Sequence, residues 1–191
     1  MTKQIDANWA AGDDAGGFPS GLSLAADTGY YLFAIGKADG TVDFGFDTSA
    51  TAANLLSDAT GYTYYKAIWW VITNSSSNIR GFVQINGDTC EYSAGITDVN
   101  DTTGTSGVNE TGTISAPPSS EVKVHGYVNN SSAAGISLYI NNLLCLYNYD
   151  FIGGKIEARV DSNSQLAYKF TVSSGGLTSE EIVTQGWRKK W

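Results

Sequence analysis

Short runs of alternating or apolar residues follow one another along nearly all of this 191-residue chain, and each run ends in a cluster of Gly, Asn, Ser or Asp. Such runs, separated by turn residues, are typical of β-strands, in which successive side chains point to opposite faces. A helical pattern is confined to "ATAANLLSDA" at 50–59, which favours one short helical turn. The sequence therefore predicts an all-β fold, an antiparallel β-sandwich or jelly roll of about ten short strands.

Two hairpins are expected in the first half of the chain. Asp39-Gly40 is a strong turn signal between the strands 30–37 and 42–48. "NSSSN" is expected to join the strand 62–73 to a return strand at 79–87. Further strands are expected at 89–94, 121–130, 136–142, 143–151, 154–162, 166–174 and 180–190.

The segment 95–113 is long, polar and without apolar periodicity. It reads as a surface loop or as the link between two halves of a sandwich. A single β-sandwich domain over 1–191 is expected, and 95–119 is where that domain would subdivide.

Composition excludes two classes of partner. Charged residues make up only 16% of the chain, the net charge is −8, and the one cationic run is Arg188-Lys189-Lys190. Nucleic-acid binding depends on clustered Lys and Arg, so neither nucleic acid nor an anionic membrane surface is an expected partner. No apolar run approaches the roughly 20 residues of a membrane-spanning helix, so no membrane insertion is expected.

Residues with catalytic chemistry occur without the context that a catalytic site needs. His125, the only histidine, lies on the polar face of "VKVHGYV", and no nucleophile motif accompanies it. Asp13-Asp14 and Glu180-Glu181 are adjacent pairs whose side chains would point apart on a strand, so both pairs are interpreted as solvated charge. The sequence thus predicts a protein without catalytic residues, which is not an enzyme.

Cys90 and Cys145 have no metal-ligand spacing and are expected to pack as free thiols, with a disulfide as the alternative. "DVNDTTGTSGVNE" at 98–110 begins like a calcium loop, but Thr103 and Asn109 replace the glycine and glutamate that shape such a loop. Neither a metal nor another cofactor is therefore expected.

An aromatic strand carries the candidate contact residues. Regular alternation over 62–73 would place Tyr62, Tyr64, Lys66 and Trp70 on one face, and Trp69 on the other face with the core. Exposed aromatic side chains suit either a sugar or a partner subunit, whereas buried ones fill a core. The four residues of the first face are therefore candidates for a ligand or subunit contact.

Three segments resemble, in order, a domain found in tail-fibre-type proteins of phage and prophage particles. They are "KQIDANWAAGDDAGG", "SLAADTGYYLFAIGKADGTVDFGFDTSATAANL" and "GYTYYKAIWWVITNSSSNIRGFVQINGD". "VKVHGYV" after "APPSS" and the closing "VTQGW" are similar as well, so the resemblance extends over nearly the whole chain. The chain departs from the family pattern at Lys66-Ala67, where two basic residues are common, and at Trp69-Trp70, where small residues are common.

This resemblance implies a non-enzymatic β-sandwich on the exterior of a virion. Its expected partners are other virion proteins, further copies of the chain, most often as a homotrimer, and a glycan of the host surface. One alternative is a capsid decoration or head-fibre protein without a receptor role. A remote alternative is a glycan-cleaving tail spike, which would need two carboxylates converging in a groove.

Overall fold

In a computed structural model, the chain forms an all-β structure, which confirms the predicted fold class. The structure describes residues 1–102, 105–130, 134–148, 152–174 and 177–189. The chain divides into two compact units, Met1–Arg80 and Gly81–Trp191. The segment 95–119, where a subdivision was expected, lies inside the second unit. Within the described ranges, no helix is long and apolar enough to cross a membrane.

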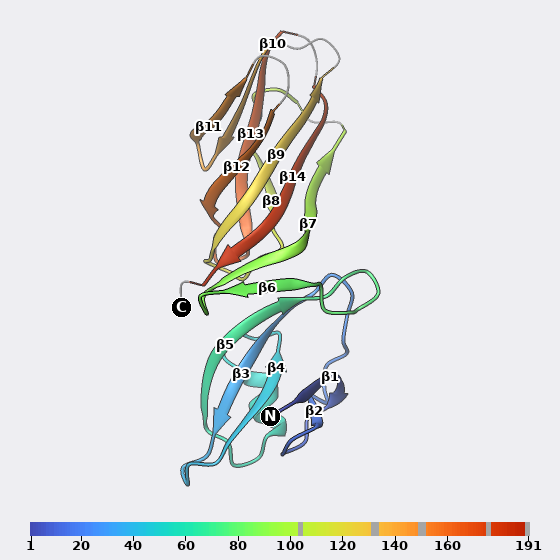
Figure 1. Cartoon of the computed structure of the whole chain (residues 1–191), viewed down its shortest axis with the longest axis vertical. Helices are drawn as coiled ribbons and strands as arrows, with labels where there is room; N and C mark the ends of the chain where they lie inside the picture. Colours follow the sequence, from blue (N-terminus) through green and yellow to red (C-terminus); the bar gives the residue numbers. More distant parts are fainter. Residues whose placement is uncertain (103–104, 131–133, 149–151, 175–176, 190–191) are drawn as a thin grey trace. The chain divides into compact units, whose positions relative to one another are not determined.

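The first unit is built on a three-stranded antiparallel sheet in the order β4-β3-β5 (Figure 1). A pair of parallel strands, β1 and β2, and a short helix, α1, complete it. The elements are β1 (Lys3–Asn8), β2 (Ala15–Phe18), β3 (Gly29–Gly36), β4 (Val42–Asp47), α1 (Ala53–Asp58) and β5 (Tyr64–Ile72).

The predicted hairpin and helical turn are both present in this unit. β3 pairs with β4 around a turn in which Gly40 adopts a positive φ of 89°, a conformation that glycine reaches without steric cost. Phe33 and Ile35 of β3 are buried on one face of the sheet. On the same face, Leu55 of α1 packs over Gly45 of β4, where a Cβ atom would lie only 2.4 Å from the leucine.

The sequence did not indicate the strands β1 and β2, because β1 is largely polar. A buried ion pair holds β1 to the sheet: Lys3 Nζ lies 2.9 Å from a carboxylate oxygen of Asp43, and both side chains are at most 3% exposed. The same ammonium donates to the carbonyl oxygen of Ala10 at 2.6 Å. Because an ion pair rather than apolar side chains holds β1 in place, the sequence of this strand shows no hydrophobic alternation.

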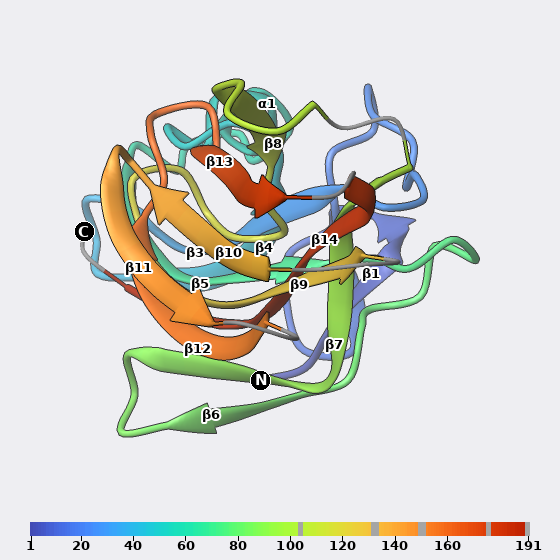
Figure 2. The ribbon, with the colours of Figure 1, turned by 90° about the horizontal axis from the view of Figure 1, so that it is seen from above.

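The second unit contains two sheets, one of five strands in the order β12-β9-β14-β7-β6 and one of four strands in the order β11-β10-β13-β8. β11 lies beside β12 at one edge (Figure 2). At the other edge, β7 contacts β8. The strands are β6 (Phe82–Ile85), β7 (Thr89–Asp101), β8 (Glu110–Thr113), β9 (Glu121–Asn130), β10 (Ala134–Ile140), β11 (Leu143–Asn148), β12 (Ile152–Arg159), β13 (Gln165–Ser174) and β14 (Leu177–Arg188). The strands predicted from 121 onward are thus confirmed, although residues 149–151 and 190 lie outside the described ranges.

Alternating apolar residues form the core between the two sheets. Val122, Val124 and Val128 of β9 are buried, as are Leu138 of β10 and other large side chains of the facing sheet. Gly126 lies among the valines, and a Cβ atom there would come within 2.2 Å of Leu138 Cδ2. The absence of a side chain at Gly126 lets the two sheets approach closely.

The segment 95–113 is not the continuous polar loop that the sequence suggested. β7 continues to Asp101 and β8 begins at Glu110. The pairing of β7 with β14 shifts at Asp98, where an extra residue forms a β-bulge. Ile96 and Val99 are consequently both buried although they are three residues apart. This spacing hides the strand from a search for strict alternation.

The expected return strand at 79–87 is also corrected. The turn after β5 is closed by a bridge between Thr73 and Ile79. β6, which follows, pairs with β7 and belongs to the five-stranded sheet. β5 instead takes β3 as its partner in the three-stranded sheet.

Both cysteines are free thiols, as expected. Cys90 lies in β7 and is buried, which together with the charge of Glu91 raises the pKa of its thiol to about 12. Cys145 lies in β11 of the other sheet, where its thiol donates to the carbonyl oxygen of Leu143 at 3.2 Å. Burial therefore keeps Cys90 in its unreactive thiol form.

Candidate functional site

A β-bulge at Ile68 changes which residues of β5 share a face. Leu32 of β3 pairs with Trp69, but its neighbour Phe33 pairs with Ala67, so Ile68 is the extra residue of β5. Directly paired residues lie on the same face of a sheet. Trp69 therefore shares a face with Lys66.

Trp70 consequently lies on the face opposite to Tyr64 and Lys66, which corrects the grouping expected from regular alternation. Its pairing with Tyr31 places it on the face of Phe33. Only 6% of Trp70 is exposed, and its indole lies directly over Gly29, where a Cβ atom would be 2.2 Å from the ring. Trp70 is thus part of a packed interior in this structure.

Tyr62 is likewise buried, with 6% of its surface exposed, and it lies before the first residue of β5. Its ring meets Trp9 edge-on with the ring centroids 5.6 Å apart, and Lys37 Nζ lies 4.7 Å from its centroid. Burial, together with the charges of Asp43 and Asp39, raises the pKa of the Tyr62 phenol. Tyr62 therefore connects the N-terminal segment to the end of the sheet.

Tyr64 and Lys66, in contrast, are exposed side by side on one face of β5. Gly36 of β3 lies opposite both Tyr64 and Val42, so these three residues cross the sheet in one row. Tyr64 is 63% exposed and Val42 is 53% exposed, and Gly36 between them has no side chain. We call Val42, Gly36, Tyr64 and Lys66 the aromatic row.

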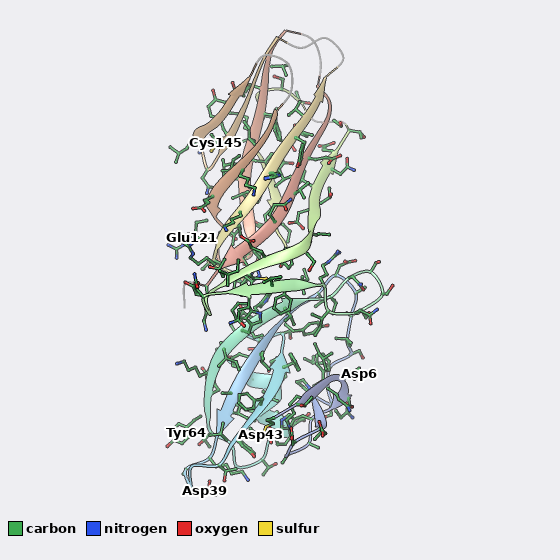
Figure 3. All side chains as sticks on the ribbon, viewed as in Figure 1. Asp6, Asp39, Asp43, Tyr64, Glu121 and Cys145 are labelled. Atoms are coloured by element: carbon green, nitrogen blue, oxygen red, sulfur yellow. The ribbon has the colours of Figure 1, made fainter. Side chains whose placement is uncertain are left out.

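The aromatic row lies near the β3–β4 turn, and Figure 3 shows Tyr64 pointing away from the sheet at the end that carries Asp39. Asp39 accepts a hydrogen bond from the backbone N–H of Thr41 at 2.8 Å, which lowers the pKa of its carboxyl group below the ordinary value. Lys37 Nζ lies over the Tyr62 ring in the same region. The row thus combines the exposed apolar surface of Val42 and Tyr64 with the ammonium group of Lys66, near the end of the sheet that carries Asp39.

His125 occupies the outward face of β9, as predicted. It is half-buried between Lys123 and Tyr127 along the strand, and its Nδ1 lies 2.9 Å from the hydroxyl oxygen of Tyr127. Its strand partners are Lys155 and Val183. Among these described neighbours, only the phenol of Tyr127 is in hydrogen-bond contact with the imidazole, and none is a carboxylate or a Ser, Thr or Cys nucleophile.

A second group of side chains converges in the second unit. One carboxylate oxygen from each of Asp101, Glu110 and Glu180 lies within 4.8 Å of the other two. We call these three residues the carboxylate cluster. Glu180 of β14 pairs directly with Asp101 of β7, and Glu110 belongs to β8 of the other sheet. The cluster therefore spans the two sheets.

Burial makes Glu180 the unusual member of the carboxylate cluster. Only 2% of the residue is exposed, which corrects its interpretation as solvated charge. This burial, with the charges of Glu110 and Asp101, raises the pKa of Glu180 to about 7. Glu110 also accepts a hydrogen bond from the Tyr168 hydroxyl at 2.8 Å, and burial and this carboxylate raise the pKa of the phenol.

Sequence reasoning missed the carboxylate cluster although part of its signal was present. Glu180 alternates with Ile182 and Thr184, which are both completely buried, whereas Glu181 points to the other face. This alternation indicated an inward Glu180. The partners could not be found in this way, because Glu110 comes from a different sheet.

Asp98, which the calcium-loop comparison singled out, lies outside the cluster. The bulge directs its carboxylate to Ser115, whose backbone N–H and hydroxyl donate to it at 2.8 and 2.6 Å. The hydroxyl of Thr184 donates to it as well. Asp98 therefore satisfies the chain's own donors.

No protein-family model matches this chain, and no curated protein sequence matches it either.

Proposed function

We propose that this chain is a non-enzymatic structural protein on the exterior of a phage or prophage particle, of the tail-fibre type, and that the aromatic row binds a glycan of the host surface. The exposure of Tyr64 beside a bare glycine is the observation that carries the binding role. A tyrosine ring offers an apolar face together with a polar hydroxyl, the combination that a sugar ring requires.

The surroundings of the row support this assignment. Lys66, on the same face, offers ammonium donors to sugar hydroxyl groups. Val42 and the open backbone of Gly36 extend the apolar floor across the sheet. Ligand sites commonly combine such apolar surface with a few polar groups that fix the ligand's orientation.

The carboxylate cluster argues against the glycan-cleaving alternative. Glycosidases use two carboxylates that flank the scissile bond, about 5–9.5 Å apart, with the sugar between them. The cluster brings its oxygens within 4.8 Å of one another, and Glu180 is almost completely buried. Because Glu180 is almost completely buried, the cluster does not present the accessible pair of carboxylates that glycan cleavage needs.

Binding by variants tests the role of the aromatic row. Tyr64→Ala is expected to reduce binding to host cells or to a glycan array by roughly fivefold, since an aromatic contact contributes about 1 kcal/mol. Tyr65→Ala is the matched control, because Tyr65 is 46% exposed on the opposite face of the same strand. Unchanged binding by a folded Tyr64→Ala variant would exclude the row as the glycan site.

A capsid decoration or head-fibre protein is the second candidate, in which a subunit covers the same exposed apolar strip. Mass measurement in solution and the gene's neighbours separate the two candidates. A trimer that dissociates in Tyr64→Ala, from a gene beside that of a major capsid protein, would favour decoration. A monodisperse monomer would count against the trimer in both candidates.

A further inference from the structure

The carboxylate cluster has no part in the proposed glycan contact, which lies in the first unit of the chain. It gathers three acidic side chains from β7, β8 and β14 at one place between two sheets. Like charges at such distances repel one another, and the repulsion grows as water is removed. An arrangement of this kind requires compensation.

The chain's own residues compensate Glu180 only in part: a side-chain hydrogen bond with Glu110 contributes to the raised pKa of Glu180. Its Oε1 atom is buried and has no hydrogen-bond partner among the described residues. Glu110 accepts one hydrogen bond from Tyr168, and no ion pair within the described ranges involves Glu110 or Glu180. A buried carboxylate oxygen without a donor costs free energy, so this atom indicates a missing positive partner.

We propose that the carboxylate cluster binds a calcium ion, which links the two sheets of the second unit through Asp101, Glu110 and Glu180. Three atoms that are at most 4.8 Å apart all lie within about 2.8 Å of a common point, close to the 2.3–2.6 Å of Ca²⁺–oxygen contacts. Three carboxylates supply up to six oxygen ligands, which matches the number that Ca²⁺ accepts. Magnesium needs stricter octahedral geometry and shorter contacts, so the cluster fits calcium better.

The partial exposure of two cluster members provides an entry path. Asp101 ends β7 and Glu110 begins β8, and both side chains are half-buried, whereas Glu180 forms the buried side of the site. An ion can therefore reach the cluster from solvent without opening the core. Once bound, it replaces the repulsion between β7, β8 and β14 with a shared attraction.

Calorimetric titration of the full chain with CaCl₂ after EDTA treatment, at a pH above neutrality, tests this site. We expect a dissociation constant at or below about 10⁻³ M, the weak end of calcium modules. Calcium a hundredfold above that constant is expected to raise the melting temperature by about 5–10 °C. Tb³⁺ is a second probe, since excitation of Tyr168 beside Glu110 should sensitise its emission.

Variants show whether the cluster is the site. Glu180→Gln and Asp101→Asn are each expected to weaken Ca²⁺ binding at least about tenfold, because ligand charge determines affinity in such sites. Glu181→Gln, on the opposite face of β14, should bind calcium like the wild type. Absence of Ca²⁺ binding at about 10 mM, or equal binding by a folded Glu180→Gln variant, would overturn the proposal. A proton shared between carboxylates of the cluster would then be what offsets their repulsion.

Discussion

Glu180→Gln is expected to remove a pH dependence of stability from the metal-free protein. Burial and the nearby charges of Glu110 and Asp101 raise the pKa of Glu180 from 4.5 to about 7 in the folded state. Between these values, the folded protein keeps a proton that the unfolded chain has released. The protonated form of Glu180 therefore stabilises the folded protein at low pH, and this stabilisation is lost as the pH rises to about 7.

The size of this effect follows from the shift. Each pKa unit corresponds to about 1.4 kcal/mol, so the shift of Glu180 corresponds to about 3 kcal/mol of unfolding free energy. Glutamine keeps the shape of the protonated side chain but does not titrate. The wild type should therefore lose about 3 kcal/mol of unfolding free energy through Glu180 between pH 4.5 and about pH 8, and the Glu180→Gln variant should not.

Urea denaturation in EDTA, followed by circular dichroism at both pH values, measures this difference. Urea is uncharged, so it does not screen the carboxylates while it unfolds the chain. The comparison with the wild type cancels the titration of groups elsewhere, and Glu181→Gln controls for the loss of one negative charge from the same strand. An equal pH dependence in the wild type and in Glu180→Gln would refute the assigned burial and repulsion.

Two further predictions concern packing. Lys3→Met should lower the unfolding free energy of the first unit by about 3–5 kcal/mol in urea denaturation, because it leaves Asp43 buried without its cation. Adding Asp43→Leu should restore part of this loss, whereas an unchanged stability of the single variant would contradict the role of the ion pair. Gly126→Ala should lower the unfolding free energy by about 1–3 kcal/mol, because its Cβ atom would overlap Leu138 between the sheets. An unchanged melting temperature would show that the sheets separate easily.

Alternation and turn signals predicted the strands and their buried faces correctly wherever the strand pairing is regular. The Asp39-Gly40 turn located the first hairpin correctly, and "EVKVHGYV" separated the buried valines from His125. β3 pairs with β4, and β9 pairs with β12, without a register shift, so counting by two follows the actual faces of these strands. The fold class and most strands of the second unit were predictable for this reason.

Irregular strand pairing and contacts between distant segments were not predictable from local sequence patterns. The bulge at Ile68 reversed the face expected for Trp70, and the bulge at Asp98 hid the second half of β7. The sequence contains no residue type that announces either bulge. The carboxylate cluster depends on β8 lying beside β7, an arrangement of two sheets that no local pattern encodes.

The bulge at Ile68 also bears on how this strand tolerates changes of length. When Ile68 is left out of the count, the remaining residues of β5 alternate regularly between the two faces. Ile68 thus behaves like a one-residue insertion that the sheet has absorbed at a single point. A lineage can gain or lose such a residue without turning the buried tryptophans outward, so homologues that differ in length here can keep the same inside and outside.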